Sequence, residues 1–294
     1  MEQYQVSIIG SGLIGSAVGK VLACQGCKVS FHDIDESKLS LLSSQGYKIC
    51  REMEEAVLST DFSFICVPTP NTERRFNPDS LREACSQVVK ILDSKDNYHV
   101  VAIKSTVLPG VIESLGLNRG KRNYGFCLNP EFLRSETPED DFRNSKFIII
   151  GSFDERASLT LKAFYEDFRE RVGGKFEIVI TDPKTAAMIK YACNSLLATK
   201  ISFFNEIYEV CKRLDVDLEI VMRHTLTDKI ATSEWYRRKF LQFGFQDECL
   251  PKDLDAFITF CKGFNPGVEI EVLRSVRRVN QRKSKQIDGN IPLR

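Results

Sequence analysis

The first part of the chain alternates short apolar runs with amphipathic segments, the pattern of a parallel sheet covered by helices. Helical periodicity is clear in segments 13–25 and 155–170. The apolar runs, which we expect to be buried strands, lie at residues 6–9, 27–32, 62–67, 98–103, 125–128, 147–150 and 177–180. The pattern therefore predicts an α/β domain with a doubly wound, mostly parallel sheet.

The pattern changes at Pro183. Residues 184–214 contain neither glycine nor proline and carry apolar side chains at helical spacing, which predicts one long helix. Two further helices are expected at about 254–262 and 266–285. We therefore expect two domains: the α/β domain at 1–183, and an all-α domain at 184–294 with a long central helix.

A glycine-rich turn follows the first predicted strand directly. It reads Gly10-Ser-Gly12-Leu-Ile-Gly15, and the second predicted strand ends at Asp33. Strand, glycine turn, helix and acid at this spacing form the dinucleotide-binding fingerprint of a Rossmann-type domain. The glycines let the backbone approach a pyrophosphate, which the helix N-terminus attracts. Asp33 would bind ribose hydroxyls and repel a 2′-phosphate, so NAD is expected rather than NADP.

Polar residues follow three other predicted strands, at the sheet edge where α/β proteins bind ligands. They form the segments Pro68-Thr69-Pro70-Asn71, Lys104-Ser105-Thr106 and Asn129-Pro130-Glu131. On the long helix, Lys190 and Asn194 are four residues apart and share a face. This pair either meets a ligand or forms an ordinary solvated edge.

A thiol, an ammonium and a carboxylate lie close together in Cys249-Leu-Pro-Lys252-Asp253. Cysteine reacts as its thiolate, and a neighbouring cation favours that form. Pro251 fixes one backbone dihedral and so limits the motion of the segment. The segment is therefore a candidate nucleophile site. The alternative is a buried cysteine before a helix start, with Asp253 as a solvated acid in the first turn.

Composition narrows the classes of function. The 294 residues are 43% hydrophobic and 28% charged, as in ordinary globular proteins. The net charge of +1 gives no field that would recruit nucleic acid or an anionic membrane. The basic residues of the last predicted helix lack the interleaved aromatics of a nucleic-acid surface. We expect no nucleic-acid partner.

No apolar run approaches the roughly 20 residues that cross a bilayer. The polar N-terminus does not read as a signal peptide. We therefore expect a cytoplasmic protein without membrane contact. The ten cysteines, including Cys24 and Cys27, have irregular spacing. They predict reduced packing thiols and no metal site.

Seven short motifs, in order along nearly the whole chain, resemble the UDP-glucose/GDP-mannose dehydrogenase family. They are Gly10-x-Gly12-x-x-Gly15, Val67-Pro-Thr-Pro70, Lys104-Ser-Thr106, Asn129-Pro-Glu-Phe-Leu-Arg134, Lys190-x-x-x-Asn194, Phe203-x-Asn205-Glu206 and Cys249-Leu-Pro-Lys-Asp253. The resemblance implies oxidation of a nucleotide sugar, with UDP-glucose to UDP-glucuronate as the expected reaction. It implies two hydride transfers to NAD⁺ and a homodimer formed through the long helix.

The resemblance also assigns roles to individual residues. Cys249 would form a thiohemiacetal and then a thioester, while Lys190 and Asn194 would stabilise the oxyanion. Asp253, Thr106 and Glu131 would position water and transfer protons. The expected cofactor contacts are Gly10, Gly12, Leu13, Ile14, Gly15, Asp33, Lys38, Pro68, Thr69 and Thr106. The expected substrate contacts are Phe132, Leu133, Arg134, Lys190, Asn194 and Lys252.

The sequence also departs from the family pattern. Residues Gln246, Asp247 and Glu248 stand where the family has a glycine turn, and their side chains would hinder a diphosphate. Ser135 replaces an acid, and Lys229 replaces an arginine whose bidentate contact lysine cannot reproduce. Family members also continue into a second nucleotide-holding domain that this sequence does not contain.

Two alternatives therefore stay open. One is a two-electron dehydrogenase of a smaller hydroxy acid, which would share the layout and a catalytic lysine on the long helix. The other is a non-catalytic NAD-sensing or assembly subunit, which the altered glycine turn would suit. The first alternative predicts one NADH per substrate, and the second predicts NAD binding without turnover.

Overall fold

The computed structural model describes residues 3–73, 75–115, 123–225, 244–245, 249–262 and 271–287. The chain divides into two compact units. The first contains the residues up to Pro70 and from Phe76 to Lys190, and the second contains Asn71–Arg75 and the residues from Tyr191 onwards. This division falls inside the long helix, whereas the sequence places a domain boundary at its start.

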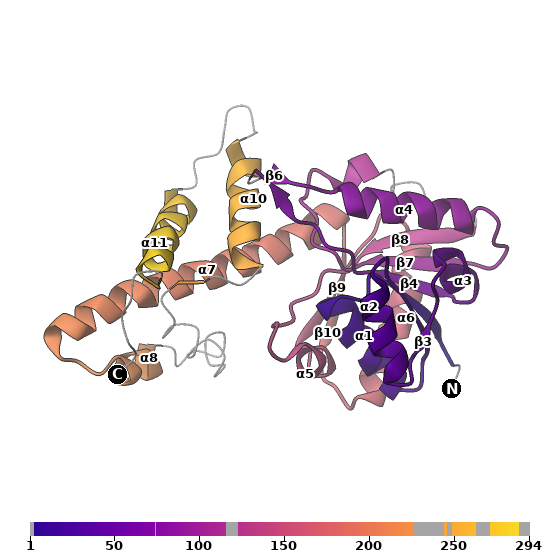
Figure 1. Ribbon diagram of the computed structural model, residues 1–294, viewed down its shortest axis with the longest axis horizontal. Helices are drawn as coiled ribbons and strands as arrows, with labels where there is room; N and C mark the ends of the chain where they lie inside the picture. The colour runs from indigo at the N-terminus through magenta and orange to yellow at the C-terminus, as the bar shows by residue number, and fades with distance from the viewer. Residues whose placement is uncertain are drawn as a thin grey trace. The chain divides into compact units, whose positions relative to one another are not determined.

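The first unit is built on an eight-stranded sheet, ordered β3-β2-β1-β4-β7-β8-β9-β10 (Figure 1). The strands are β1 (Gln5–Ile9), β2 (Lys28–His32), β3 (Lys48–Ile49), β4 (Phe62–Ile65), β7 (His99–Ile103), β8 (Tyr124–Leu128), β9 (Phe147–Gly151) and β10 (Glu177–Thr181). Neighbours from β3 to β8 pair in parallel, while β9 runs antiparallel to β8 and parallel to β10. The predicted mostly parallel, doubly wound sheet is confirmed.

Helices cover both faces of this sheet (Figure 1). On one face the core contains residues of α1 (Leu13–Cys24), α5 (Pro138–Arg143) and α6 (Glu155–Arg171). On the other face it contains residues of α3 (Met53–Leu58), α4 (Asp79–Leu92), the 3₁₀ turn η1 (Ile112–Leu115) and the start of α7. The short helix α2 (Glu36–Ser44) follows β2 and packs beside β3.

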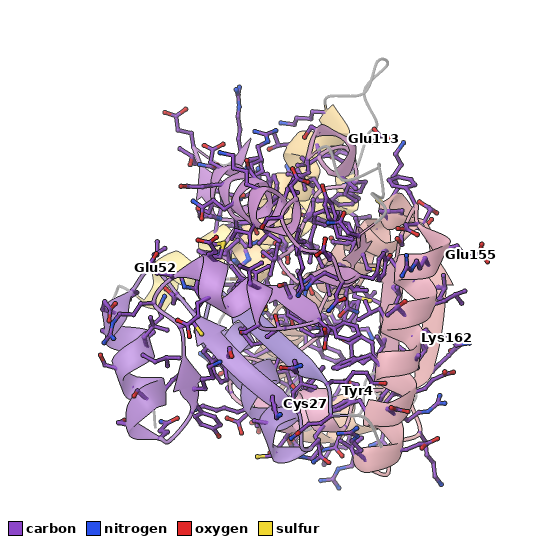
Figure 2. The ribbon with its side chains drawn as sticks, turned by 90° about the vertical axis from the view of Figure 1, so that its right-hand side faces the viewer. Tyr4, Cys27, Glu52, Glu113, Glu155 and Lys162 are labelled. Atoms are coloured by element: carbon purple, nitrogen blue, oxygen red, sulfur yellow. The ribbon has the colours of Figure 1, made fainter. Side chains whose placement is uncertain are left out.

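Helix α6 shows why these segments are helical. Its buried residues recur at three- and four-residue steps through Ala157, Leu161, Phe164 and Phe168. Glu155 and Lys162, labelled in Figure 2, are seven residues apart and share its polar side. Asp154 caps the helix by accepting a hydrogen bond from the N–H of Ala157.

The second unit is helical. It contains most of α7 (Pro183–Leu214), followed by α8 (Leu218–Thr225), α10 (Leu250–Lys262) and α11 (Glu271–Ile287). Its core joins apolar residues of these four helices, including Phe204, Met222, Leu254 and Val276. The fold class expected from the sequence, an α/β sheet domain followed by a helical part with a long central helix, is confirmed.

Several details differ from the sequence expectation, and one is the two-residue strand β3, which no predicted apolar run covers. Helix α10 begins at Leu250 rather than near residue 254, because proline is tolerated in a first helical turn. The chain between β4 and α4 also forms a short hairpin of β5 (Asn71–Thr72) and β6 (Arg75–Phe76), which apolar periodicity did not indicate. Of the last predicted helix, residues 271–287 are described, and 266–270 lie outside the described part of the chain.

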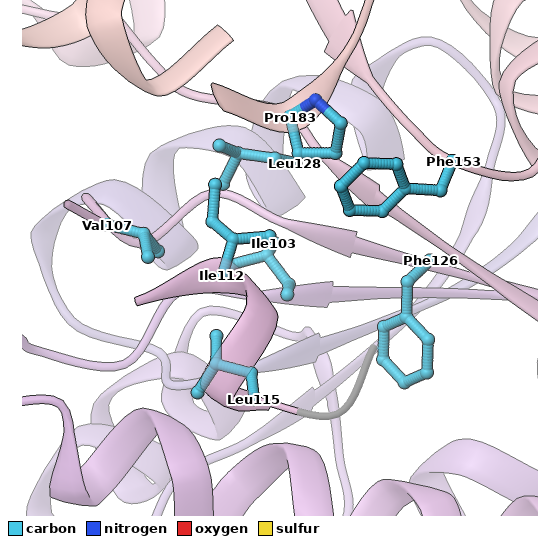
Figure 3. A pocket seen from close by; sticks show the side chains of 8 residues that line it. All are labelled: Ile103, Val107, Ile112, Leu115, Phe126, Leu128, Phe153 and Pro183. Atoms are coloured by element: carbon cyan, nitrogen blue, oxygen red, sulfur yellow. The ribbon is translucent and has the colours of Figure 1, made fainter. Parts of the chain in front are cut away.

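An apolar cavity of about 20 Å³ lies beside the ends of β7 and β8 (Figure 3). Ile103, Leu128 and Pro183 are among its lining residues. It has room for about one water molecule and offers no polar partners, so it is a packing void rather than a ligand site. No helix in the described ranges is long and apolar enough to span a membrane.

Candidate active site

In the glycine turn between β1 and α1, a side chain would clash at two of the three glycines and would find free space at the third. Gly10 has φ +93°, and a Cβ there would lie 2.9 Å from the backbone of Cys66. A Cβ on Gly15 would lie 2.0 Å from the carbonyl oxygen of Gly10. At Gly12, however, a Cβ would meet no atom within 4 Å. The fold therefore requires Gly10 and Gly15, whereas the space at Gly12 suits a pyrophosphate at the start of α1.

Leu13 and Ile14 form the first turn of α1, beside that open space. Gly12 is the N-cap, and no side chain caps its helix. The first N–H groups of α1 are therefore not satisfied by a cap, which fits the binding of an anion there.

Asp33 is fixed at the end of β2. Its Oδ2 accepts a hydrogen bond of 2.7 Å from the N–H of Ser11, and its Oδ1 accepts one of 2.9 Å from the N–H of Asp35. The ammonium of Lys38 lies 3.4 Å from Oδ1. Each carboxylate oxygen keeps acceptor capacity for a ribose hydroxyl. The arrangement fits a dinucleotide with a free 2′-hydroxyl and opposes a 2′-phosphate.

Two of the predicted strand-end segments meet. The hydroxyl of Thr69 donates to the carbonyl oxygen of Thr106 at 3.0 Å. The hydroxyl of Ser105 donates to the carbonyl oxygen of Val67 at 2.7 Å. Pro68 lies between the two contacts in sequence. The expected cofactor residues Pro68, Thr69 and Thr106 are therefore brought together at the ends of β4 and β7, neighbours in the sheet.

Lys190 and Glu131 form a buried ion pair. Lys190 Nζ lies 3.1 Å from Glu131 Oε1, with side chains 6% and 10% exposed. Glu131 Oε2 accepts a hydrogen bond of 2.6 Å from the N–H of Leu133. The ammonium also lies 5.4 Å from the ring centroid of Phe132. Lys190 is thus no solvated edge, and the structure brings two predicted catalytic residues together.

The other expected substrate contacts in this segment are engaged within the protein. Arg134 pairs with Asp141 through Nε and Nη2, at 2.8 and 2.5 Å, and its N–H donates to the same carboxylate. Phe132 packs edge-on against Phe147, and Leu133 packs against the sheet core. The substrate roles of Phe132, Leu133 and Arg134 therefore stay predictions.

Cys249 is the N-cap residue of α10. Its carbonyl oxygen accepts a hydrogen bond of 2.9 Å from the N–H of Asp253, and the residue is exposed. The positive end of a helix dipole stabilises a thiolate at this position. The alternative given by the sequence, a buried cysteine before a helix start, therefore does not describe Cys249.

Asp253 is only 2% exposed. Its Oδ1 accepts from the ammonium of Lys252, and its Oδ2 accepts from the amide of Asn194, both at 2.5 Å. A buried carboxylate with two such donors is held in one orientation rather than solvated. The predicted catalytic residues Asn194 and Asp253 and the predicted substrate residue Lys252 therefore form one cluster in the helical unit.

Three residues with specific contacts had no individual role in the sequence analysis, although Lys104 and Asn71 lie in its polar strand-end segments. Lys104 is buried, and its Nζ lies 5.4 to 5.9 Å from the ring centroids of Phe64, Phe142 and Tyr165. Burial lowers the pKa of Lys104 to about 8. A lysine directly after a mostly apolar strand was the available signal. Asp141, which pairs with Arg134, gave no local signal. Asn71, which donates to the carbonyl oxygen of Lys252, was marked only by its place in a polar strand-end segment.

Three expectations fall on residues that the structure does not describe. They are the segments Gln246–Glu248 and Asp228–Ile230 and the side chain of Glu206. Among the residues that are described, no group of histidine, cysteine or acidic side chains is placed to hold a metal ion. None of the nine cysteine side chains that the structure describes is joined in a disulfide.

Comparison with known proteins identifies the family of this chain. Residues 40–169 match the NAD-binding domain of the UDP-glucose/GDP-mannose dehydrogenase family, and residues 184–282 match its central domain. A GDP-mannose 6-dehydrogenase of Pseudomonas syringae pv. syringae is 31% identical over 94% of this chain and 68% of its own length. The UDP-glucose 6-dehydrogenase AglM of Haloferax volcanii is 31% identical over 94% and 69%.

Among solved structures, a UDP-glucose dehydrogenase from Pyrobaculum islandicum superposes with a TM-score of 0.80 at 30% identity. That match covers 96% of this chain and 68% of the other. The chain thus spans about two thirds of the length of these relatives. The motifs, the sheet topology and these matches agree, and the chain belongs to the UDP-glucose/GDP-mannose dehydrogenase family, whose cofactor is NAD.

Proposed function

We propose that this chain oxidises the primary alcohol of a nucleotide sugar to a carboxylate, with UDP-glucose as the substrate and UDP-glucuronate as the product. The observation that carries the proposal is the exposed thiol of Cys249 on the N-terminal turn of α10, beside a buried Asp253 oriented by Asn194. An oxidation that stops at the aldehyde needs no thiol. A helix-capping cysteine therefore favours the four-electron reaction over a two-electron one.

NAD supplies the hydride acceptor in each of the two oxidations. In the first, the sugar hydroxyl loses its proton through Glu131 or water held by Thr106, and an aldehyde forms. The Cys249 thiolate then adds to the aldehyde carbon, forming a C–S bond and an oxyanion. Lys190 stabilises that oxyanion, and Asn194 is a second donor because its amide has one N–H beyond the bond to Asp253.

Loss of the second hydride from that carbon leaves a thioester. Water, positioned by Asp253, attacks the thioester carbon, the C–S bond breaks, and the thiolate and the carboxylic acid are released. A carboxylate fixed by two donors is suited to orient this water, since it needs no reorganisation during the step. GDP-mannose is the alternative substrate, because relatives with either specificity match this chain at similar identity.

The test is the Cys249→Ser variant. It should make no uronic acid from UDP-glucose while binding NAD with unchanged affinity by calorimetry, since the nucleophile and the glycine turn belong to different units. Cys24→Ser, at another exposed thiol, is the matched control and should keep full activity. Uronic acid formation by Cys249→Ser at the wild-type rate would refute the mechanism.

We also propose that the chain forms a homodimer through α7. Leu196 and Phe203 are 49% and 50% exposed, and they are seven residues apart on one face of that helix. A Phe203→Glu variant should shift the mass measured by light scattering from dimer to monomer. A wild-type chain that is monomeric at micromolar concentration would contradict this proposal.

A further inference from the structure

We infer that Asn71 is a positioning residue that holds the N-terminal turn of α10, and with it the thiol of Cys249. The inference rests on the proposed function for its catalytic consequence, but not for its structural basis. The chain leaves the first unit at Pro70 and returns to it at Phe76. The five residues between them belong to the helical unit.

Asn71 is the first residue of this excursion, and its side chain reaches α10. Its Nδ2 donates a hydrogen bond of 2.8 Å to the carbonyl oxygen of Lys252, across 181 residues of sequence. Only an N–H donates to a carbonyl, so this contact fixes which way the amide points. The carbonyl has two lone pairs, so it accepts Asn71 in addition to the helix's own hydrogen bond.

The other end of the same amide supports the assignment. Asn71 Oδ1 is buried and has no hydrogen-bond partner within the described part of the chain. A buried oxygen without a partner is unfavourable, and an aliphatic side chain in that place would avoid the penalty. Any stabilisation by the amide of Asn71 therefore comes from its N–H group, which forms the hydrogen bond to α10.

The anchored carbonyl lies between the two functional residues of α10. Cys249 and Asp253 are joined by the hydrogen bond that closes the first turn, from the N–H of Asp253 to the carbonyl oxygen of Cys249. First turns fray easily because their backbone groups lack partners on one side. A bond to Lys252 in the middle of that turn restrains it, and so fixes the directions of the thiol and of the Asp253 carboxylate.

The same restraint acts on the thiolate. A helix N-terminus stabilises an anion only while the first turn is formed, because the effect comes from the aligned N–H groups. Loosening the turn should therefore make the Cys249 thiol less acidic and less reactive near neutral pH. This consequence is measurable on the purified chain without any substrate.

The experiment measures alkylation of Cys249 by iodoacetamide as a function of pH, resolved by peptide mass spectrometry. Asn71→Leu keeps the size of the side chain and removes the donor without adding charge. It should lower the alkylation rate at pH 7 at least threefold and move the alkylation midpoint to higher pH. Asn71→Gln, which keeps an amide donor one methylene further out, should recover at least half of the lost rate.

Alkylation of Cys24, exposed in the first unit, is the internal control and should be the same in all three proteins. Wild-type alkylation of Cys249 in Asn71→Leu would overturn the inference. So would an Asn71→Gln rate as low as that of Asn71→Leu, because the donor would then not be what matters. Circular dichroism melting confirms that each variant is folded before it is labelled.

Activity provides a second and separable readout. If the chain oxidises a nucleotide sugar, Asn71→Leu should lower kcat severalfold and leave the KM for NAD unchanged. If no nucleotide sugar is oxidised but the alkylation profile shifts as expected, the proposed function fails while the role of Asn71 stands. Unshifted alkylation in an active enzyme would remove the role of Asn71 alone.

Discussion

Lys190 Nζ lies 3.1 Å from Glu131 Oε1, and the two side chains are 6% and 10% exposed. Removing one partner of a buried ion pair leaves the other charge desolvated and unpaired. Lys190→Met should therefore lower the free energy of unfolding by about 3 kcal/mol, measured by urea denaturation. In the proposed mechanism it should also reduce kcat by roughly 100-fold, because the oxyanion loses one of its two donors.

The same helix provides a matched control. Lys184 pairs with Glu113 at 2.7 Å, but both side chains are about half exposed. Lys184→Met should change stability by no more than about 0.5 kcal/mol. The double variant Lys190→Met with Glu131→Gln should regain stability but not activity. Equal stability losses in the Lys190 and Lys184 variants would show that the buried pair contributes no more to the free energy of unfolding than the exposed pair does.

The glycine turn allows fold and cofactor binding to be separated. A Cβ at Gly12 would meet no protein atom within 4 Å, and the residue has a φ of −68° that alanine adopts freely. Gly12→Ala should therefore melt at the wild-type temperature yet bind NAD at least ten times more weakly by calorimetry. Gly15→Ala, whose Cβ would lie 2.0 Å from the carbonyl oxygen of Gly10, should lose both stability and binding. Wild-type NAD affinity in Gly12→Ala would mean that the pyrophosphate lies elsewhere.

Acid stability should depend on His99, which is fully buried in the sheet. Its Nε2 lies 2.8 Å from the hydroxyl of Ser63, and its Nδ1 lies 3.0 Å from the ammonium of Lys95. Burial, and then the charge of Lys95, lower the pKa of His99 to about 3. In the unfolded chain the pKa of histidine is about 6.5. Between pH 6.5 and pH 3 the unfolded state therefore binds a proton on this histidine and the folded state does not.

The stability contributed by neutral His99 is therefore complete above pH 6.5 and is lost as the pH falls toward 3. Between pH 7 and pH 5 the loss should be about 2 kcal/mol in the free energy of unfolding. His99→Gln should show a correspondingly shallower pH dependence in urea titrations, whatever its stability at pH 7. A steep wild-type slope retained in His99→Gln would assign the acid sensitivity to other groups.

The parts of this structure that the sequence predicted are those encoded locally. Apolar runs marked seven of the eight strands of the large sheet. The interval from Gly10 to Asp33 marked the dinucleotide turn, because turn, helix and second strand fall within one short stretch of chain. The long helix was also predicted from local sequence, since residues 184–214 contain no glycine or proline. The start of α10 was misplaced because Pro251 reads as a break, whereas in a first helical turn it is tolerated.

The parts that it did not predict are pairings between distant segments. Nothing near Asn71 indicates a bond to the carbonyl oxygen of Lys252, 181 residues away. Arg134 looked like a free guanidinium for a substrate until Asp141 was seen to hold it. Lys104 reads as a polar strand end, and only packing shows that three aromatic rings surround its ammonium. Such contacts depend on tertiary geometry, which no local pattern encodes.

The stoichiometry of oxidation tests the central claim most directly. The purified chain is given excess NAD⁺ and a limiting amount of UDP-glucose, with GDP-mannose in a parallel reaction, and NADH is followed by its absorbance to completion. An oxidation that passes through a Cys249 thioester predicts two NADH for each sugar consumed, with the uronic acid as the only product by mass spectrometry. One NADH per sugar, or none with either substrate despite measurable NAD binding, would contradict it.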